Sequence, residues 1–489
     1  MTLVTQNKQL GFWILTAFVV GNMVGSGIFM LPRTLAEVAS PAGVIIAWGL
    51  TGLGVLTIAL VFGNLAVRKP HLTGGPQIYA KELFKEDSTA SKLSGFMSTW
   101  GYWIGNFAGN IAIVTTFAGY LSTFFPILTS QAVLLTVGDF TLKVGNALTF
   151  TVCTIMLWGV HYIIMTGINH AGKINFIATA GKVVGFGLFI IIGLFAFEKA
   201  NILPFVEMKV DGSGVSHGLM GQVNLAAVST LWAFLGVESA VVFASRAKRK
   251  SDVKTATIVG LMIAIAIYMG ISTLVMGMLS QDALLASDKP LIDAITAVLG
   301  PVGGKALAFV GLISLFGSTI GWVLLSAEIP DQAAKQGFFI PAFLKENKNG
   351  VPTFSMVVSN GLGQLFIFST ISNSIAAAFD FIIYVATLSY LVPYLISSTF
   401  QLKLVWTGET YQAHEKRSRI FDGLIGLLAT GYSIWVIIKG TADLTTFLFG
   451  VILLASGILF YGYLPKNQKE VERIKHSYEK EAALAVDTE

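Results

Sequence analysis

Long apolar stretches separated by short polar segments run through the chain from residue 11 to residue 463. A helix that crosses a membrane needs roughly 20 mainly apolar residues, and these stretches have that length. The pattern predicts about twelve transmembrane helices, at residues 11–35, 41–66, 95–125, 146–167, 174–197, 220–244, 255–279, 301–329, 353–370, 373–401, 420–438 and 444–463. Residues 1–10 and the charged residues 465–489 are interpreted as polar ends outside the membrane.

Composition excludes a water-soluble protein of this size. Of the 489 residues, 54% are hydrophobic and only 12% are charged, whereas soluble domains carry about 25% charged residues. The chain has one cysteine, Cys153, so it cannot form an internal disulfide. The expected fold class is therefore an all-α polytopic membrane protein.

The positive charges predict which side of the membrane each loop faces. Most of the 32 Lys and Arg residues fall in the tail and in loops on the same side as the N-terminus. Cytoplasmic loops carry such an excess, so both termini are predicted to be cytoplasmic. The basic run at 246–250 follows an apolar stretch directly, and we interpret it as holding this topology rather than binding nucleic acid.

Two apolar stretches contain small residues in the middle: GNMVGSGIF in the first and LWAFLGVESAVVF in the sixth. Matching interruptions in two halves of a transporter indicate discontinuous helices and a binding site at mid-membrane. Unwound peptide groups cannot stay unpaired in hydrocarbon. A zwitterion would complete them, with its carboxylate at the N–H groups of Ser26 and Gly27 and its ammonium at freed carbonyls. The alternative is that the glycines only let helices pack closely.

Two charged residues lie deep inside predicted spans, away from the span ends. Lys182 lies roughly 13 Å beyond Lys173 along a helix, and a lysine at such depth is costly unless paired or hydrated. It could carry a coupling proton, replace a sodium ion, or reach a water-filled vestibule without functional weight. Glu238, beside the second interruption, could accept a cationic substrate, relay a proton or bond to unwound backbone. Glu328 lies nearer a span end and is expected to be solvated.

Aromatic and amide side chains add further candidates. Trp232, within the second interrupted stretch, could stack on a cation or close a cavity as a gate. Asn106 and Asn110 share one helix face, and they could bind a ligand or another helix equally well. The chain has no Walker, HExxH or GxSxG motif, so we expect no enzyme activity, no cofactor and no metal site.

Four segments resemble the amino acid–polyamine–organocation (APC) superfamily: GNMVGSGIFMLP, GFMSTWGYWIGNFAGNIAIV, STLWAFLGVESAVVFASRAKRKSDV and LLSAEIPDQAAKQGFFIPAFLKENKNGVP. They are most similar to its basic amino acid/polyamine antiporter family, which includes arginine/ornithine and arginine/agmatine exchangers. The resemblance implies a five-plus-five inverted repeat, at residues 11–200 and 220–403, with two further helices at 420–463. It also implies exchange of amino acids or amines across the cytoplasmic membrane by alternating access.

The resemblance implies a role for each site residue. Ser26 and Gly27 would bind the substrate carboxylate, and the carbonyls of Met23, Trp232 and Leu235 its ammonium. The remaining substrate positions are Asn106, Asn110, Trp322 and Ala386. The implied coupling and gating residues are Lys182, Glu238, Trp232, Tyr102 and Tyr394.

The sequence differs from the arginine/agmatine exchangers at two positions, and these differences leave the identity of the substrate side chain undecided. Trp322 would pack on a long basic side chain and Asn110 would bond a guanidinium. Ala386, however, replaces a hydroxyl residue and Asn106 a small thiol residue, so ornithine, lysine or a neutral amino acid also remain. A proton-coupled symporter of the same fold, and a sensor or channel, are the alternative functions. The expected partners are the substrate, the lipid bilayer and, as one option, a second copy of the chain.

Overall fold

The computed structural model describes residues 10–486 apart from 73, 86–87, 139, 211–213, 288, 373–374, 441–443 and 467. The predicted polar end at 1–10 thus lies outside the described residues, except for Leu10. The Leu10 N–H donates to the Arg246 carbonyl at 3.2 Å, and the Lys248 N–H donates to the Leu10 carbonyl at 2.9 Å. The start of the described chain is therefore held against the basic run.

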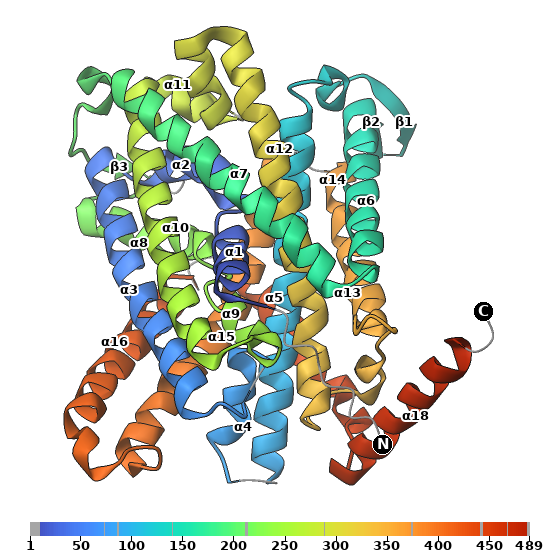
Figure 1. Ribbon diagram of the computed structural model, residues 1–489. Helices are drawn as coiled ribbons and strands as arrows, with labels where there is room; N and C mark the ends of the chain where they lie inside the picture. The colour runs from blue at the N-terminus through green and yellow to red at the C-terminus, as the bar shows by residue number, and fades with distance from the viewer. Residues whose placement is uncertain are drawn as a thin grey trace.

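The described chain is mainly helical (Figure 1). The first helices are α1 (Phe12–Met23), α2 (Gly27–Val38), α3 (Pro41–Arg68), α4 (Tyr79–Glu82), α5 (Thr89–Leu121), α6 (Val144–Met165), α7 (Ile168–Phe195), α8 (Leu219–Ala233), α9 (Ser239–Val242) and α10 (Lys250–Met278). They are followed by α11 (Gln281–Ala286), α12 (Pro290–Lys335), α13 (Thr353–Ile367), α14 (Ser369–Ser372), α15 (Ile375–Thr407), α16 (Lys416–Gly440), α17 (Leu444–Ala455) and α18 (Gln468–Val486). Two antiparallel hairpins pair β1 (Val133–Val137) with β2 (Phe140–Lys143) and β3 (Lys209–Val210) with β4 (Ser216–His217).

The apolar pattern placed the membrane spans correctly. Among the described residues, eight helices are long and apolar enough to cross a membrane, or nine if α8 and the bent helical segment after it form one span. The other predicted spans, at 353–370, 373–401 and 444–463, coincide with α13, α15, and α17 with the 3₁₀ turn at Ser456–Tyr463. The prediction of an all-α polytopic membrane protein is confirmed.

One predicted boundary was wrong. The span predicted at 301–329 is the much longer α12, which begins at Pro290 and bends at Gly300, where φ is +70°. A Gly–Pro pair such as Gly300–Pro301 is typical of a turn. Gly300 instead tolerates the positive φ of a kink, and the helix continues on both sides.

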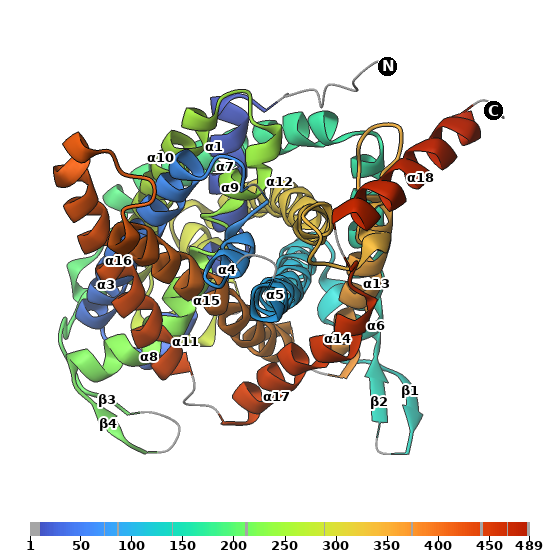
Figure 2. The ribbon, with the colours of Figure 1, turned by 90° about the horizontal axis from the view of Figure 1, so that it is seen from below.

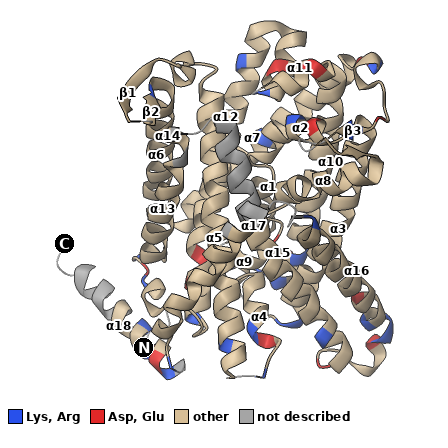
Figure 3. Cartoon of the chain, turned by 180° about the vertical axis from the view of Figure 1, so that it is seen from behind, with Lys and Arg blue, Asp and Glu red and all other residues tan. Residues whose placement is uncertain are grey.

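The two ends of the molecule differ in their content of positive charge. The β1–β2 hairpin and α11 lie at the upper end in Figure 1, and α4 and α18 lie at the lower end. Lys and Arg gather at the lower end more densely than at the upper end (Figure 3). The lower end is the side that the positive charges predict to be cytoplasmic.

The interrupted helices lie in the interior of the bundle. Seen from below, α5 and α12 lie near the centre, and α16 and α6 lie further out (Figure 2). The apolar part of the α1–α2 span is 89% buried and that of α5 is 83% buried, compared with 33% for the span that contains α16. The central helices thus face protein on nearly every side, and their polar groups must find partners there.

Candidate substrate site at two interrupted helices

The first interruption separates α1 from α2 at residues 24–26. Gly21, Gly25 and Gly27 surround it, and glycine weakens a helix by about 1 kcal/mol relative to alanine. Ser26 precedes α2 and is buried; its side chain does not cap the helix, and its hydroxyl has no described hydrogen-bond partner. The first N–H groups of α2 lack partners within their own helix. The predicted discontinuity is confirmed, and it exposes donors suited to a carboxylate.

The second interruption lies between Ala233, the last residue of α8, and Ser239, the first of α9. Gly236 has φ of +100°, a conformation that favours glycine. A Cβ at this position would lie 2.8 Å from the Cβ of Asn22 in α1, so the two interruptions are in contact. The Asn22 amide nitrogen donates to the Ser239 hydroxyl at 2.8 Å, and that hydroxyl donates to the Gly236 carbonyl at 2.5 Å. This contact requires glycine at 236.

Lys182 of α7 binds the carbonyl side of the first interruption. It is fully buried, and its ammonium donates to the carbonyls of Val24 at 2.6 Å and Gly21 at 3.0 Å and to the Ser318 hydroxyl of α12 at 2.7 Å. The Ser318 hydroxyl in turn donates to the Gly21 carbonyl at 2.7 Å. A cation at the C-terminal end of α1 also interacts favourably with the helix dipole. Lys182 therefore holds the unwound segment through these three contacts.

Glu238 joins the second interruption to two tyrosines. The hydroxyl of Tyr102 in α5 donates to one carboxylate oxygen at 2.6 Å, and the hydroxyl of Tyr394 in α15 donates to the other. The Gly236 N–H lies 3.2 Å from the oxygen that Tyr394 contacts. Of the three roles left open for Glu238, bonding to unwound backbone is present in the structure. Three residues predicted for coupling and gating thus form one buried cluster.

Two tryptophans lie over α5 beside the interruptions. The ring centroids of Trp232 and Trp322 are 5.8 Å apart, and the Trp322 indole N–H donates to the Asn22 carbonyl at 2.9 Å. A Cβ at Gly109 of α5 would lie 2.5 Å from the Trp322 ring and 3.0 Å from the Trp232 ring. The indoles therefore lie directly against the residue that precedes Asn110. Figure 2 places α5 and α12 next to each other near the centre of the bundle.

Several buried polar atoms near these rings have no described partner. The Asn106 amide nitrogen donates to the Tyr102 carbonyl at 3.0 Å, but its oxygen is unpaired, as is that of Asn110. Tyr390, whose ring centroid is 6.0 Å from that of Trp322, has an unpaired hydroxyl. Ala386 is buried one helical turn before Tyr390 on α15. Buried polar atoms are normally hydrogen-bonded, so this set indicates a place for a polar ligand.

Sequence reasoning missed Tyr268. Its hydroxyl, from α10, lies 2.5 Å from the Met23 carbonyl and 2.6 Å from the Ala233 carbonyl, so it bridges both interruptions. The Met23 carbonyl, predicted to bind the substrate ammonium, thus already has a protein partner. A tyrosine in the middle of an apolar span was the available signal, because a buried Tyr hydroxyl usually finds a hydrogen-bond partner.

The prediction for Glu328 was wrong. Glu328 is fully buried, and its two oxygens accept from the Arg246 guanidinium at 3.0 and 3.1 Å. Next to this pair, the Lys335 ammonium lies 2.6 Å from an Asp331 oxygen and 2.5 Å from a Glu346 oxygen. Arg246 was interpreted only as a topology signal; its burial follows from the fold bringing α12 and the loop after it against the end of the sixth span. A carboxylate near a span end is solvated only if no other element covers it.

The fold defines a class: a multi-pass helical membrane protein with two discontinuous helices that meet in its interior, an architecture typical of secondary transporters. The sequence profile of the amino acid permease family matches residues 10–468. The chain belongs to this family. The predicted APC membership is confirmed, and the family is one of transporters rather than enzymes.

Three relatives are similar to this chain over nearly their full lengths. A Bacillus subtilis (strain 168) protein named "Putative arginine/ornithine antiporter" is 50% identical over 466 residues, which cover 95% of this chain and 99% of the relative. Proteins named "Arginine/ornithine antiporter" from Pseudomonas aeruginosa (35% identical; 93% of this chain, 90% of the relative) and Latilactobacillus sakei (32%; 94% and 91%) are also similar.

Proposed function

We propose that this protein exchanges a basic amino acid, such as arginine, for ornithine or a related amine by alternating access. The observation that carries the proposal is the contact between the two helix interruptions, together with the buried Asn106, Asn110 and Tyr390 oxygens that have no described hydrogen-bond partner. The names of three relatives support exchange and a basic substrate. They favour an antiporter over the proton-coupled symporter.

In this proposal each part of the substrate meets a different group. The carboxylate binds the free N–H groups at Ser26 and Gly27, where the helix dipole favours an anion. The α-ammonium binds carbonyls of the interruptions, at Met23, Trp232 and Leu235, and shares them with their present protein donors. The bound zwitterion would supply the partners that the unwound peptide groups lack.

The basic side chain of the substrate would extend toward α5. There it would lie on the Trp322 ring, which attracts a cation through its π system, with the Asn110 and Asn106 amide oxygens as acceptors. Ala386 would leave space at the end of this pocket. Lys182 and Glu238 would couple binding to rearrangement of the interruptions, with Trp232 as a gate and Tyr102 and Tyr394 on the access path.

The proposal also covers the orientation of the protein in the membrane, its internal repeats and its oligomeric state. The protein would lie in the cell membrane with both termini in the cytoplasm, as the positive charges predict. Residues 11–200 and 220–403 would be the two inverted repeats, and residues 420–463 would add two helices. A homodimer is the assembly to test, by measuring the mass of the detergent-solubilised protein.

A competition panel tests the substrate. Purified protein is reconstituted into vesicles loaded with ornithine, and uptake of labelled arginine is measured against unlabelled amino acids and amines. We expect basic amino acids to compete strongly and neutral ones weakly. Strong competition by neutral amino acids alone would reject the basic substrate.

A second measurement separates exchange from symport. Vesicles with an empty lumen are given an inwardly directed proton gradient, and uptake is compared with that into ornithine-loaded vesicles. Exchange predicts uptake only in the loaded vesicles. Equal uptake into empty vesicles would show that the protein is a symporter.

A further inference from the structure

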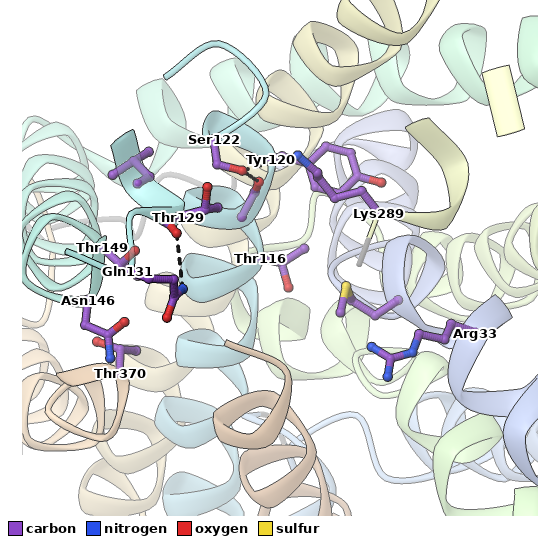
Figure 4. Close-up of a pocket in the computed structure, with 13 residues that line it drawn as sticks. Arg33, Thr116, Tyr120, Ser122, Thr129, Gln131, Asn146, Thr149, Lys289 and Thr370 are labelled. Carbon is purple, nitrogen blue, oxygen red and sulfur yellow. Dashed lines mark hydrogen bonds between the residues drawn. The ribbon is translucent and has the colours of Figure 1, made fainter. Parts of the chain in front are cut away.

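A cavity lies above the interruptions, at the end of the molecule that carries the β1–β2 hairpin. It has a volume of about 540 Å³ and is lined from α2, α5, α6 and the segment before α12 (Figure 4). Thr116, which lines it, lies on α5 roughly 9 Å along the helix beyond Asn110. Under the proposed topology this cavity is an outer vestibule on the way to the site.

The vestibule is positively charged. Among its described lining residues the only ionised side chains are Arg33 and Lys289, and no Asp or Glu lines it. Figure 4 shows both cations on the same side of the cavity. Two carboxylates lie nearby without lining the cavity: Glu37 pairs with Arg33 at 3.1 Å, and Asp293 accepts from the Ser287 hydroxyl at 2.5 Å. The charge that faces an entering solute is therefore positive.

The lining also holds a buried polar group without a partner. Tyr120 is only 1% exposed, and its hydroxyl has no hydrogen-bond partner among the described residues. The Lys289 ammonium has two long contacts, at 3.3 Å, with the hydroxyls of Ser122 and Thr123. An ammonium, a guanidinium and a hydroxyl donor thus line the same cavity, and such groups are suited to a carboxylate, because charge-assisted hydrogen bonds are the strong ones.

We infer that this vestibule, at Arg33, Lys289 and Tyr120, is a first binding station for the carboxylate of an entering amino acid. The inference rests on the proposed function and narrows its substrate class. Amino acids would enter from outside in preference to the amines formed from them by decarboxylation, since such amines bring positive charge without a carboxylate. The imported substrate would thus be an amino acid.

A matched pair of solutes isolates the contribution of the substrate carboxylate to recognition by the vestibule. Ornithine and 1,4-diaminobutane carry the same two amino groups, and they differ by the carboxylate alone. The ratio of their inhibition constants for uptake of labelled arginine therefore reports recognition of the carboxylate. That ratio is measured in ornithine-loaded, right-side-out vesicles for the wild type, for Lys289→Gln and for Arg33→Gln, with Lys305→Gln as the control. Lys305 is an exposed cation on α12 that is not among the lining residues.

We expect the preference for ornithine to fall about threefold in each vestibule variant, the scale for two unit charges about 6 Å apart in a high-dielectric cavity. The loss should shrink at high salt, where exposed charges are screened. Lys305→Gln should keep the wild-type ratio.

The result that overturns the station is an unchanged ratio in both vestibule variants while arginine/ornithine exchange continues. If one vestibule variant does not fold, the other still tests the station. The exchange rate of the wild type tests the proposed function independently. If the wild type exchanges no basic amino acid, the proposed function fails. If external 1,4-diaminobutane is taken up in exchange for internal ornithine as readily as external arginine is, only the station fails.

Discussion

Lys182→Met is the sharpest test of the first interruption. Methionine keeps an unbranched side chain of similar length and removes only the ammonium with its donors. The Gly21 carbonyl would keep its hydrogen bond from Ser318 at 2.7 Å, but the Val24 carbonyl would lose its contact with Lys182 at 2.6 Å. A buried carbonyl left without its partner costs about 1–3 kcal/mol. The charge that faces the C-terminal end of α1 would also be lost.

The lost contacts would destabilise the interrupted conformation of α1 and α2 relative to other conformations of the folded protein. A difference of about 1–3 kcal/mol between two conformations corresponds to roughly a 5–150-fold change in their ratio. We therefore expect arginine affinity and the exchange rate to fall within that range, while the apparent unfolding temperature in detergent changes little.

The assay is equilibrium binding of labelled arginine to purified protein, together with exchange in reconstituted vesicles. Lys173→Met is the matched control, because Lys173 is an exposed lysine on the same helix, and it should behave as the wild type. Wild-type binding and exchange in Lys182→Met would refute the reasoning. Lys182 would then be a residue that the fold merely accommodates.

Three other changes test the remaining contacts. Trp322→Ala should weaken binding of arginine by about 1–2 kcal/mol and that of a neutral amino acid less; equal losses would argue against cation–π stacking. Gly321→Ala would place a Cβ 1.9 Å from the Asn22 amide oxygen, so exchange should fall severalfold, and unaltered exchange would show that Asn22 moves freely. Arg246→Met leaves the buried Glu328 carboxylate without its cation at a cost of about 3–5 kcal/mol. A clear drop in the apparent unfolding temperature is expected, and restoration by Glu328→Gln would confirm the cause.

Much of the site could be predicted from the sequence because its signals are local. An apolar stretch long enough to cross a bilayer is visible in the chain itself, and so are glycines in the middle of such a stretch. The interruptions at Gly25 and Gly236 follow from these properties. Lys182 and Glu238 were found for the same reason, since an ionised residue within a span is costly wherever its partner lies.

The partners of these residues could not be predicted in this way. Tyr268 was missed although its hydroxyl contacts both interruptions, and Glu328 was expected in solvent although Arg246 binds it. In each case the contact joins segments far apart in the chain. A hydrophobicity pattern shows that a polar group needs a partner, but it does not show which helix brings one.

The sequence by itself determined which segments form apolar helices long enough for a membrane, where two of them are interrupted, and the charge asymmetry between the two ends. Each follows from composition within one segment and from the cost of placing polar groups in hydrocarbon. Tertiary structure decided that Lys182 binds the Gly21 and Val24 carbonyls, that Glu238 lies between Tyr102 and Tyr394, and that two cations line the cavity near the β1–β2 hairpin. These depend on how helices pack, because a hydrogen bond requires its two atoms to come within about 3 Å, and only the folded bundle brings these groups so close.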